Sequence, residues 1–247
     1  MRNEIKETAA VVLAAGMGTR MDSDIPKVLH VLDGRPLVRH VIDSLKRSGI
    51  EMIIVVVGYR GEMVIDSLGN DVRYVWQHEQ LGTGHAVMQA EPLLRDYPGR
   101  VLVACGDVPL ISPETYRDLA AAADDSVKAA VLTMEPENPA GYGRIIKDET
   151  GNFMRIIEDK DASDDEKRVR EVNTGTYVFD RDYLFRGLGN INTDNVQNEY
   201  YLPDALNYII ESGFSVKALK LVNAIEGTGI NTRDELLAVE RYVNENY

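Results

Sequence analysis

The residues best suited to chemistry lie near the start of the chain, in the sequence LAAGMGTRMDSDIPKVLH at residues 13–30. Gly16 and Gly18 can adopt positive φ and carry no Cβ, so successive backbone N–H groups of this loop can face a phosphate. Arg20 and Lys27 add two long cationic side chains close to the glycines. Two glycines alone also fit an ordinary tight turn, but together with both cations they favour recognition of a polyphosphate.

Two familiar nucleotide-binding loops do not fit this stretch. A P-loop requires G-x-x-x-x-G-K-[ST], which the chain lacks. The dinucleotide fingerprint G-x-G-x-x-G would need a glycine where Met21 stands. The sequence therefore predicts a phosphate loop of another kind.

Composition limits the possible partners. The 247 residues carry a net charge of -13, which argues against a general nucleic-acid binder, because that affinity comes from clustered lysines and arginines. We expect an anionic small molecule to be held by a few local cations or by a metal ion. Cys105 is the only cysteine, and no apolar stretch has the length of a signal-peptide core or a membrane span. We therefore expect a cytoplasmic chain with no membrane partner.

The elements that position the loop are predicted by short, unbroken apolar stretches. Such stretches suit strands that are covered on both faces, and they occupy residues 9–15, 52–57, 72–76, 101–105 and 129–134. Helical patterns alternate with them, at residues 36–49, 83–94 and 113–123. Right-handed crossovers would join these elements into a Rossmann-like α/β fold with a mostly parallel, doubly wound sheet. Ligands bind such sheets beyond the carboxyl ends of the strands, where the glycine loop lies.

The pattern changes after about residue 138. The expected elements are a hairpin, an exposed helix or loop, a strand and two helices, at residues 143–158, 159–171, 171–180, 202–213 and 232–246. Thr232 is a plausible N-cap of the last helix. We expect a single domain over residues 1–247. Its first lobe would end at about residue 138, a smaller mixed α/β lobe over about 139–225 would lie as a layer over the first, and the last helix would close it.

The glycine loop resembles the signature loop of the sugar-1-phosphate nucleotidylyltransferases. Further stretches match in the same order, namely WQHEQLGTGHA, GDVPL, GYGRI, IIEDKDA, EVNTGTYVF, NEYYLPD and GINTR. Within this family the chain is most similar to the N-acetylglucosamine-1-phosphate uridylyltransferases, the pyrophosphorylase half of bifunctional bacterial enzymes, because LGTGHA and GYGRI are specific to that branch. The resemblance covers nearly the whole sequence. The left-handed β-helix that follows in those enzymes, with its acetyltransferase site and trimer contacts, is not part of this sequence.

The resemblance implies transfer of UMP from UTP to N-acetylglucosamine 1-phosphate, with Mg²⁺ as cofactor. Arg20, Lys27 and Asp107 would be the catalytic residues. The two cations would contact phosphate oxygens, and Asp107 would hold Mg²⁺ together with Asn231 of GINTR. One carboxylate and one amide oxygen suffice, because Mg²⁺ completes its shell with phosphates and water. The alternatives are plain surface cations, a turn residue before Pro109 for Asp107, and an ordinary loop residue for Asn231.

The resemblance also implies which residues bind the nucleotide and the sugar. For the nucleotide these are Leu13, Ala14, Ala15, Gly16, Gly18, Thr19, Gln77, Gly82 and Thr83. The carboxamide of Gln77 can pair with uracil, and fixed backbone donors near Gly82 would then set which way the amide points. For the sugar the implied residues are Gly141, Glu158, Asn173 and Tyr200, with Thr174 as a weaker candidate.

Several alternatives stay open at this point. Gln77 and Glu158 could be exposed polar groups, and Tyr200 could be a packing residue beside Tyr201. Cys105 stands where relatives often carry tyrosine, and we interpret it as a small core residue rather than a nucleophile. The chain could also act on another sugar 1-phosphate with UTP, dTTP or CTP, or be a sugar-nucleotide sensor without catalysis.

Overall fold

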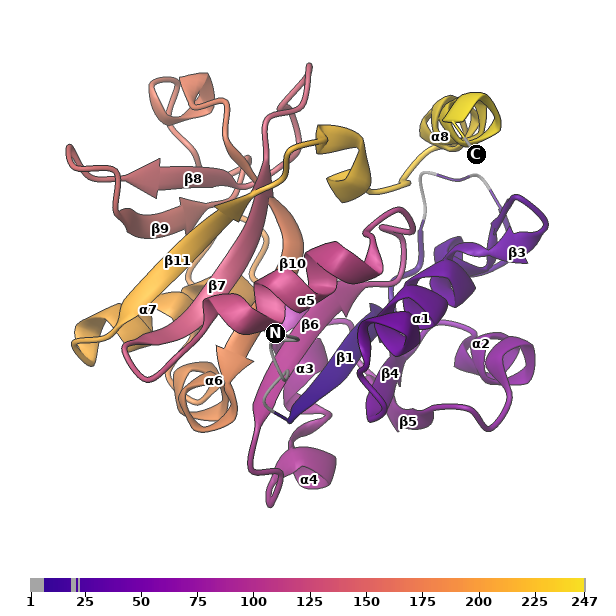
Figure 1. Ribbon diagram of the computed structural model, residues 1–247, viewed down its shortest axis with the longest axis horizontal. Coiled ribbons are helices and arrows are strands. Elements are labelled where there is room, and N and C mark those ends of the chain that lie inside the picture. Colours follow the sequence, from indigo (N-terminus) through magenta and orange to yellow (C-terminus); the bar gives the residue numbers. More distant parts are fainter. Residues whose placement is uncertain (1–6, 19–20, 22, 247) are drawn as a thin grey trace.

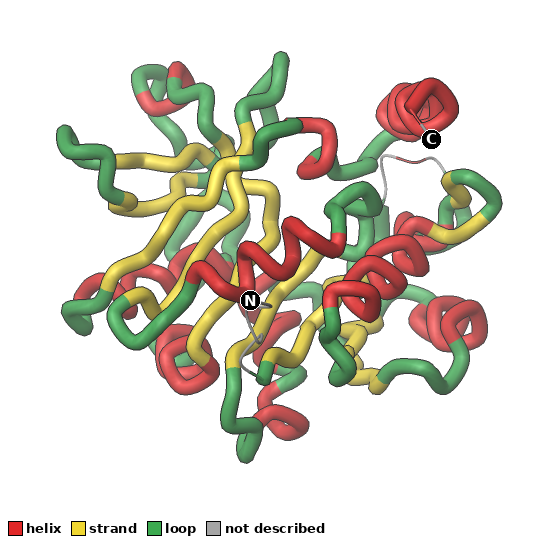
Figure 2. The backbone as a smooth tube through the Cα atoms, in the orientation of Figure 1, coloured by secondary structure: helices red, strands yellow, loops and turns green. Residues whose placement is uncertain are grey.

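The computed structural model describes residues 7–18, 21 and 23–246. Within these residues a large twisted sheet runs through the middle of the molecule, and helices cover both of its faces (Figures 1 and 2). The predicted α/β class with a mostly parallel, doubly wound sheet is therefore confirmed. No helix in the described part of the chain is long and apolar enough to span a bilayer.

The main path of the sheet has the strand order β11-β7-β10-β6-β1-β4-β5. Its strands are β1 (Thr8–Ala14), β4 (Ile53–Val57), β5 (Arg73–Trp76), β6 (Arg100–Cys105), β7 (Val127–Met134), β10 (Val172–Asp180) and β11 (Ser215–Lys220). β1 pairs in parallel with β4 and β6, β4 with β5, and β7 with β11. Only β10 on this path is antiparallel to its neighbours β6 and β7 among the described residues. The carboxyl ends of β1, β4, β5 and β6 therefore meet at one edge of the sheet.

Two helical layers enclose the sheet. The helices are α1 (Leu37–Ser48), α2 (Gly61–Leu68), α3 (Thr83–Met88), α4 (Glu91–Leu94), α5 (Pro113–Ala122), α6 (Arg181–Leu188), α7 (Ala205–Glu211) and α8 (Arg233–Asn246). One core lies under α1, α2 and α5, and the other lies under α3, α6 and α7. Ala10 and Val12 of β1 enter the first core, while Ala9 and Val11 enter the second, and all four are fully buried. Because both faces of β1 are covered, the strand is apolar at every position after Thr8.

Helix α1 shows how the sequence sets a boundary. Val38, Val41, Ile42 and Leu45 are buried on one side of it, as their spacing predicts. The helix ends at Gly49, which has φ +100° and donates its backbone N–H to the last turn. This left-handed C-cap confirms the predicted end of the helix.

The helix predicted over residues 83–94 is wrong as a single element, because α3 ends at Met88 and α4 begins at Glu91. Pro92 lies in the first turn of α4. A proline has no N–H to donate to the carbonyl four residues back, here that of Met88, and its ring collides with that carbonyl. The chain therefore restarts the helix after a short turn.

We had expected the second half of the chain to form a layer over the first half, but it does not. The predicted hairpin is present as β8 (Arg144–Lys147) and β9 (Phe153–Ile157), which extends from β10 through β8. β10 itself lies inside the sheet, between β6 and β7, and β11 lies beyond β7. The physical reason is that β10 has apolar side chains on both faces, with Val178 in one core and Phe179 in the other, so it needs cover on both sides.

Short elements complete the chain. They are the two-stranded ribbon β2 (Val31–Leu32) and β3 (Arg35–Pro36), and the 3₁₀ turns η2 (Lys27–Leu29), η3 (Glu166–Arg168), η4 (Leu202–Asp204) and η5 (Ala224–Gly227). The expected helix over 202–213 is thus η4 followed by α7. α8 packs through Val239 against Leu32 and Ile230, so the last helix closes over the ribbon that follows the glycine loop.

Candidate active site

The centre of the site is a contact among Lys27, Asp107 and Asn231. The Lys27 ammonium forms an ion pair with the Asp107 carboxylate and donates a hydrogen bond to Asn231 Oδ1 at 2.9 Å. Three residues from distant parts of the sequence therefore meet, as the resemblance implied. Lys27 begins η2, Asp107 follows the carboxyl end of β6, and Asn231 precedes α8.

Asp107 and Asn231 lie on neighbouring stretches of backbone. The backbone N–H of Ile230 donates to the carbonyl of Asp107 at 2.9 Å. The two side-chain oxygens then face one cation, the Lys27 ammonium, at hydrogen-bonding distance. One carboxylate and one amide oxygen that point at a common positive charge are the donor set that Mg²⁺ shares with phosphates and water. The residues fit the expected metal.

The glycine loop follows β1 and approaches Lys27 closely at Gly18. Gly18 has φ +64°, as the sequence predicted, and a Cβ added there would lie 2.5 Å from Lys27 Cβ. Gly16 has no positive φ, and a Cβ there would meet no atom within 4 Å. The close packing of the loop on Lys27 therefore depends on Gly18 alone of the two. Thr19 and Arg20, expected at the triphosphate, lie outside the described residues.

The predicted base-reading residue Gln77 is buried, with 3% of its surface exposed, which rules out the exposed alternative. Its Nε2 donates to the carbonyl of Gly82 at 3.0 Å. Because a carbonyl only accepts, this bond fixes which end of the carboxamide is nitrogen and presents Oε1 as the acceptor. The backbone group that sets the polarity is thus an acceptor, whereas we had expected backbone donors.

His85, to which the sequence assigned no role, supports the same amide. Its Nδ1 lies 3.2 Å from Gln77 Nε2 and accepts the second amide hydrogen. The signal was available in LGTGHA, because His85 stands in the first turn of α3, directly after the loop that contains Gly82 and Thr83.

A cavity of about 310 Å³ connects the expected sugar residues to Asn231, which together with Asp107 forms the expected metal pair. Gly141, Glu158 and Asn173 line it, together with Leu13, Thr83 and Asn231 from the other expected sets. Thr174, the weaker candidate, lines it as well. The structure therefore brings three of the four expected sugar residues together with members of the nucleotide and metal sets around one space.

Tyr200 is the expected sugar residue that is not among those lining the cavity. Its carbonyl accepts from Gly84 N at 2.7 Å, and its N–H donates to Leu81 O at 2.8 Å. A Cβ on Gly82 would lie 2.6 Å from the Tyr200 carbonyl oxygen. Tyr200 thus ties its segment to the base-reading loop through backbone groups, and Leu202 and Pro203 of the same segment line the cavity instead.

Two side chains of the cavity wall are held in place by hydrogen bonds around β10. Asn173 donates to Tyr177 Oη at 2.6 Å and accepts from Gly175 N at 2.8 Å. Gly175 has φ +77°, and a Cβ there would lie 2.8 Å from Cys105 Sγ. Cys105 lines the cavity, and burial raises the pKa of its thiol to about 12. Such a thiol is protonated at neutral pH, which agrees with a packing role and not with a nucleophile.

Glu158 is the wall residue with the most perturbed carboxyl. Burial, with smaller effects from Asp204 and Asp161, raises the pKa of Glu158 from 4.5 to about 7. Among the described residues no hydrogen bond to its carboxyl group is found, although Oε1 would lie 3.2 Å from a Cβ on Gly143. A largely desolvated carboxyl that lines a cavity without a partner suits a ligand that brings the hydrogen bond.

The raised pKa of Glu158 predicts that stability falls as pH rises from about 5 to about 8. In this range the folded state keeps a proton that the unfolded state has lost, so each pH unit favours unfolding. The complete shift corresponds to an effect on the order of 3 kcal/mol. Urea unfolding of the wild type and of Glu158→Gln checks this. The stability of the glutamine variant relative to the wild type should increase from pH 5 to pH 8, and parallel pH curves would contradict the prediction.

Comparisons with known proteins agree with this geometry. The chain is 47% identical to the bifunctional protein GlmU of Pelotomaculum thermopropionicum over 238 residues, which is 96% of this chain and 52% of that protein. The GlmU of Exiguobacterium sibiricum is 46% identical over 94% of this chain and 52% of its own length. The chain thus spans about half the length of the curated relatives it matches.

Solved structures share the fold at low sequence identity. A UDP-glucose pyrophosphorylase complexed with UDP-glucose superposes with a TM-score of 0.76 at 20% identity, over 97% of this chain and 99% of that chain. A nucleotidyl transferase from a Methanothermobacter species gives a TM-score of 0.69 at 22% identity, over 98% and 99%. At this identity the likeness concerns the fold. The model of the MobA-like NTP transferase domain matches residues 10–164, more than half of the sequence, so the chain belongs to the MobA-like NTP transferase domain family.

Proposed function

We propose that the chain transfers UMP from UTP to N-acetylglucosamine 1-phosphate, giving UDP-N-acetylglucosamine and pyrophosphate, with Mg²⁺ as cofactor. The observation that carries the proposal is the single cavity where the expected sets meet. Leu13 and Thr83 of the nucleotide set line it. Glu158 and Asn173 of the sugar set and Asn231 of the metal pair line the same space. The similarity to GlmU proteins over almost the whole chain supports this pair of substrates.

The nucleotide would lie along the end of β1. The main chain of residues 13–16 would face the nucleoside, and the loop at Gly16 and Gly18 would lie beside the phosphates. Gln77 Oε1 would accept the ring N–H of uracil, because its Nε2 is already engaged by Gly82. A base that presents an acceptor at this place would leave Oε1 unsatisfied in a buried site, which costs about 1–3 kcal/mol.

Asp107 and Asn231 would hold Mg²⁺, which when bound offsets negative charge on the triphosphate. The Lys27 ammonium, which contacts both oxygens in the structure, would turn to phosphate oxygens of the bound nucleotide. Charge-assisted hydrogen bonds from Lys27 then stabilise the pyrophosphate as it leaves.

The chemical step is an in-line displacement at phosphorus. A phosphate oxygen of the sugar 1-phosphate forms a bond to the α-phosphorus of UTP, and the bond from that phosphorus to the bridging oxygen of the β-phosphate breaks. The electron pair leaves with pyrophosphate. A sugar phosphate has a second pKa of about 6, so its oxygen is ionised at neutral pH and needs no general base. The work of the protein is to hold two anions in line.

The sugar would occupy the part of the cavity between Gly141, Glu158 and Asn173. Asn173 is fixed by Tyr177 and Gly175, so its amide is ordered before a ligand arrives. Glu158, with a pKa near 7, can donate or accept a hydrogen bond to a sugar hydroxyl at neutral pH. Tyr200 would act from outside the cavity, by ordering the base-reading loop.

The direct test is pyrophosphate release by the purified protein with Mg²⁺, a panel of nucleoside triphosphates and a panel of sugar 1-phosphates. We expect the highest kcat/KM for UTP with N-acetylglucosamine 1-phosphate. A preference for dTTP, CTP or another sugar would reassign the substrates within the same chemistry. Binding of UTP without turnover of any pair would instead favour a sugar-nucleotide sensor.

Gly18→Ala should lower kcat/KM for UTP by about 10²-fold, because a Cβ at 2.5 Å from Lys27 Cβ must displace this side chain. Gly213→Ala is the matched control. Gly213 also has positive φ, at +84°, but a Cβ there meets no atom within 4 Å. Both variants should lose about 1 kcal/mol of stability from backbone strain, and only the Gly18 variant should lose activity. Equal kinetics for the two would show that the loop does not position Lys27.

A further inference from the structure

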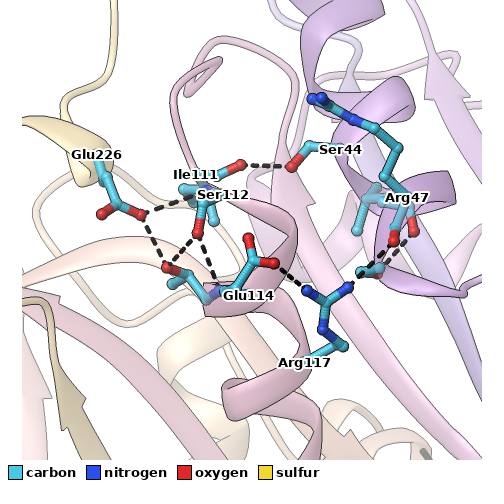
Figure 3. A network of polar contacts seen from close by, with 10 residues as sticks. Ser44, Arg47, Ile111, Ser112, Glu114, Arg117 and Glu226 are labelled. Carbon is cyan, nitrogen blue, oxygen red and sulfur yellow. Dashed lines mark hydrogen bonds and ion pairs between the residues drawn. The ribbon is translucent and has the colours of Figure 1, made fainter. Parts of the chain in front are cut away.

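The segments that carry Asp107 and Asn231 are joined at both ends. At one end the backbone N–H of Ile230 donates to the carbonyl of Asp107. At the other end Glu226 Oε2 accepts a hydrogen bond from Thr115 Oγ1 at 2.8 Å and one from the backbone N–H of Ser112 at 3.3 Å. Residues 107–112 and 226–231 are of equal length and form the two sides of this closed arrangement. Figure 3 shows Glu226 reaching from η5 to the start of α5.

The start of α5 is itself firmly attached to α1. Ser44 Oγ is buried and donates to the carbonyl of Ile111 at 2.5 Å (Figure 3). Arg117 donates to the carbonyl of Arg47 at 3.1 Å. Glu226 therefore connects η5 to a helix that is bonded to α1 and packed into the core through Tyr116 and Leu119.

The chemistry of this contact favours a carboxylate. Ser112 is the N-cap of α5, and its Oγ accepts from Thr115 N at 3.1 Å. Glu226 satisfies the N–H of the cap residue itself and places a negative charge at the positive end of the helix dipole. Both partners are part-buried, which strengthens the interaction relative to an exposed pair.

Asn231 is also held on its other side. Its backbone N–H donates to Glu235 Oε2 at 2.6 Å, and the same oxygen accepts from Thr232 N at 2.9 Å. Thr232 Oγ1 accepts from Glu235 N at 3.2 Å, which completes a capping box at the start of α8. Asn231 thus lies between the capping box of α8 and the bond from Ile230 to Asp107, and Glu226 adds a side-chain contact to the segment that follows β6.

We propose that Glu226 is a positioning residue for the metal pair: it holds the segment of Asn231 against the segment of Asp107 and so sets the separation of the two oxygen donors. The inference rests on the proposed function, because it takes these two residues as the ligands of the divalent cation. Groups that orient ligands from outside the metal site contribute about 10- to 100-fold to metal affinity.

The test measures metal binding without turnover. Mn²⁺ is titrated in the presence of UTP and followed by electron paramagnetic resonance, for the wild type, Glu226→Ala and Thr115→Val. Glu226→Ala removes both hydrogen bonds and should weaken Mn²⁺ binding by about 10-fold. Thr115→Val removes only the shorter of the two, so its loss should be smaller than that of Glu226→Ala but larger than that of the control variant below. In turnover assays the Mg²⁺ concentration for half-maximal rate should rise by a similar factor, while KM for the sugar phosphate at saturating Mg²⁺ stays unchanged.

Glu114→Ala is the control variant. Glu114 lies in the same first turn of α5, but its side chain is 73% exposed and contacts Arg117 (Figure 3). Its removal should leave Mn²⁺ binding within twofold of the wild type. An equal loss in Glu114→Ala would overturn the inference, because the cause would then be the stability of α5.

Wild-type affinity for Mn²⁺ in Thr115→Val and in folded Glu226→Ala would also overturn it, and Thr115→Val alone decides if Glu226→Ala does not fold. A wild type that binds UTP but no Mn²⁺ would remove the metal pair and the proposed function with it. The two failures are therefore distinguishable.

Discussion

Asp107→Asn should lower kcat for UMP transfer by about 10³-fold. The substitution replaces the single carboxylate of the metal pair by a neutral amide, and it also removes the ion pair that orients Lys27. The binding of Mg²⁺ and the orientation of Lys27, the two cations that would offset phosphate charge, are thus both weakened in one variant. The protein should stay folded, because the backbone bond between Ile230 and Asp107 does not involve the side chain. Pyrophosphate release at saturating substrates measures the effect.

Asp71→Asn is the matched control for this prediction. Asp71 also pairs with a lysine, Lys46, at 3.4 Å, but it precedes β5 and therefore lies at the opposite edge of the sheet from Asp107. Its removal should leave kcat unchanged. Mg²⁺-dependent turnover of Asp107→Asn within tenfold of the wild type would remove Asp107 from the active site.

Arg144→Met should reduce the free energy of unfolding by about 3 kcal/mol, because it breaks a buried ion pair from one side. The Arg144 side chain is 3% exposed and pairs with Asp159 at 3.0 Å. It also donates to the carbonyl of Tyr142, and to that of Lys167 at 3.5 Å. The substitution leaves a carboxylate and two carbonyls without this donor, and urea unfolding measures the loss.

The same variant should disturb the sugar end of the cavity. Tyr142 and Glu158 both line the cavity, on neighbouring segments, and Asp159 follows Glu158, so Arg144 joins these two parts of the wall. We expect KM for the sugar phosphate to rise by about 10-fold in the folded fraction while KM for UTP changes little. Arg155→Met on the adjacent strand is the control, since its ion pair with Glu166 is 55% exposed on the arginine side and should contribute less than about 1 kcal/mol. Equal stability of the two variants would contradict the role of Arg144.

Local patterns in the sequence were enough for most elements of the fold. The strands of the first half were predicted because unbroken apolar stretches have few other uses in a chain of this composition. The end of α1 followed from Gly49, which adopts the left-handed conformation at its C-cap. The break between α3 and α4 was also readable, at Pro92, but the continuous apolar pattern on both sides hid it.

The order of strands was beyond the reach of such patterns. The sequence of β10 is that of a buried strand, which predicts that it lies in a sheet. It does not predict which two strands are its neighbours. Its place between β6 and β7 follows from which buried surfaces fit together across some 70 residues of chain. For this reason the strands β10 and β11, which we had expected in a separate layer over the first lobe, lie in the central sheet.

The candidate site divides in the same way. The family resemblance indicated Lys27, Asp107, Asn231, Gln77, Glu158 and Asn173, and of these only Lys27 was also indicated by residue type and its place near the glycines. His85 and Arg144 lie within the matched stretches LGTGHA and GYGRI, yet the sequence assigned no role to them or to Glu226, because their roles consist of contacts with other residues. Tyr200 was selected for its aromatic side chain, yet its backbone makes the connection to the base-reading loop.

The sequence by itself determined the chemical inventory of this protein: a glycine loop that ends a buried strand, two cations, a carboxylate and an amide after other strands, and a net charge that leaves phosphate binding to local groups. Only the tertiary structure decided that Lys27 donates a hydrogen bond to Asn231, 204 positions away in the sequence, and that Gly82 packs closely against the carbonyl of Tyr200. The physical reason is that periodicity and turn propensity act over a few residues. Distances between side chains on different elements are instead set by how whole cores pack.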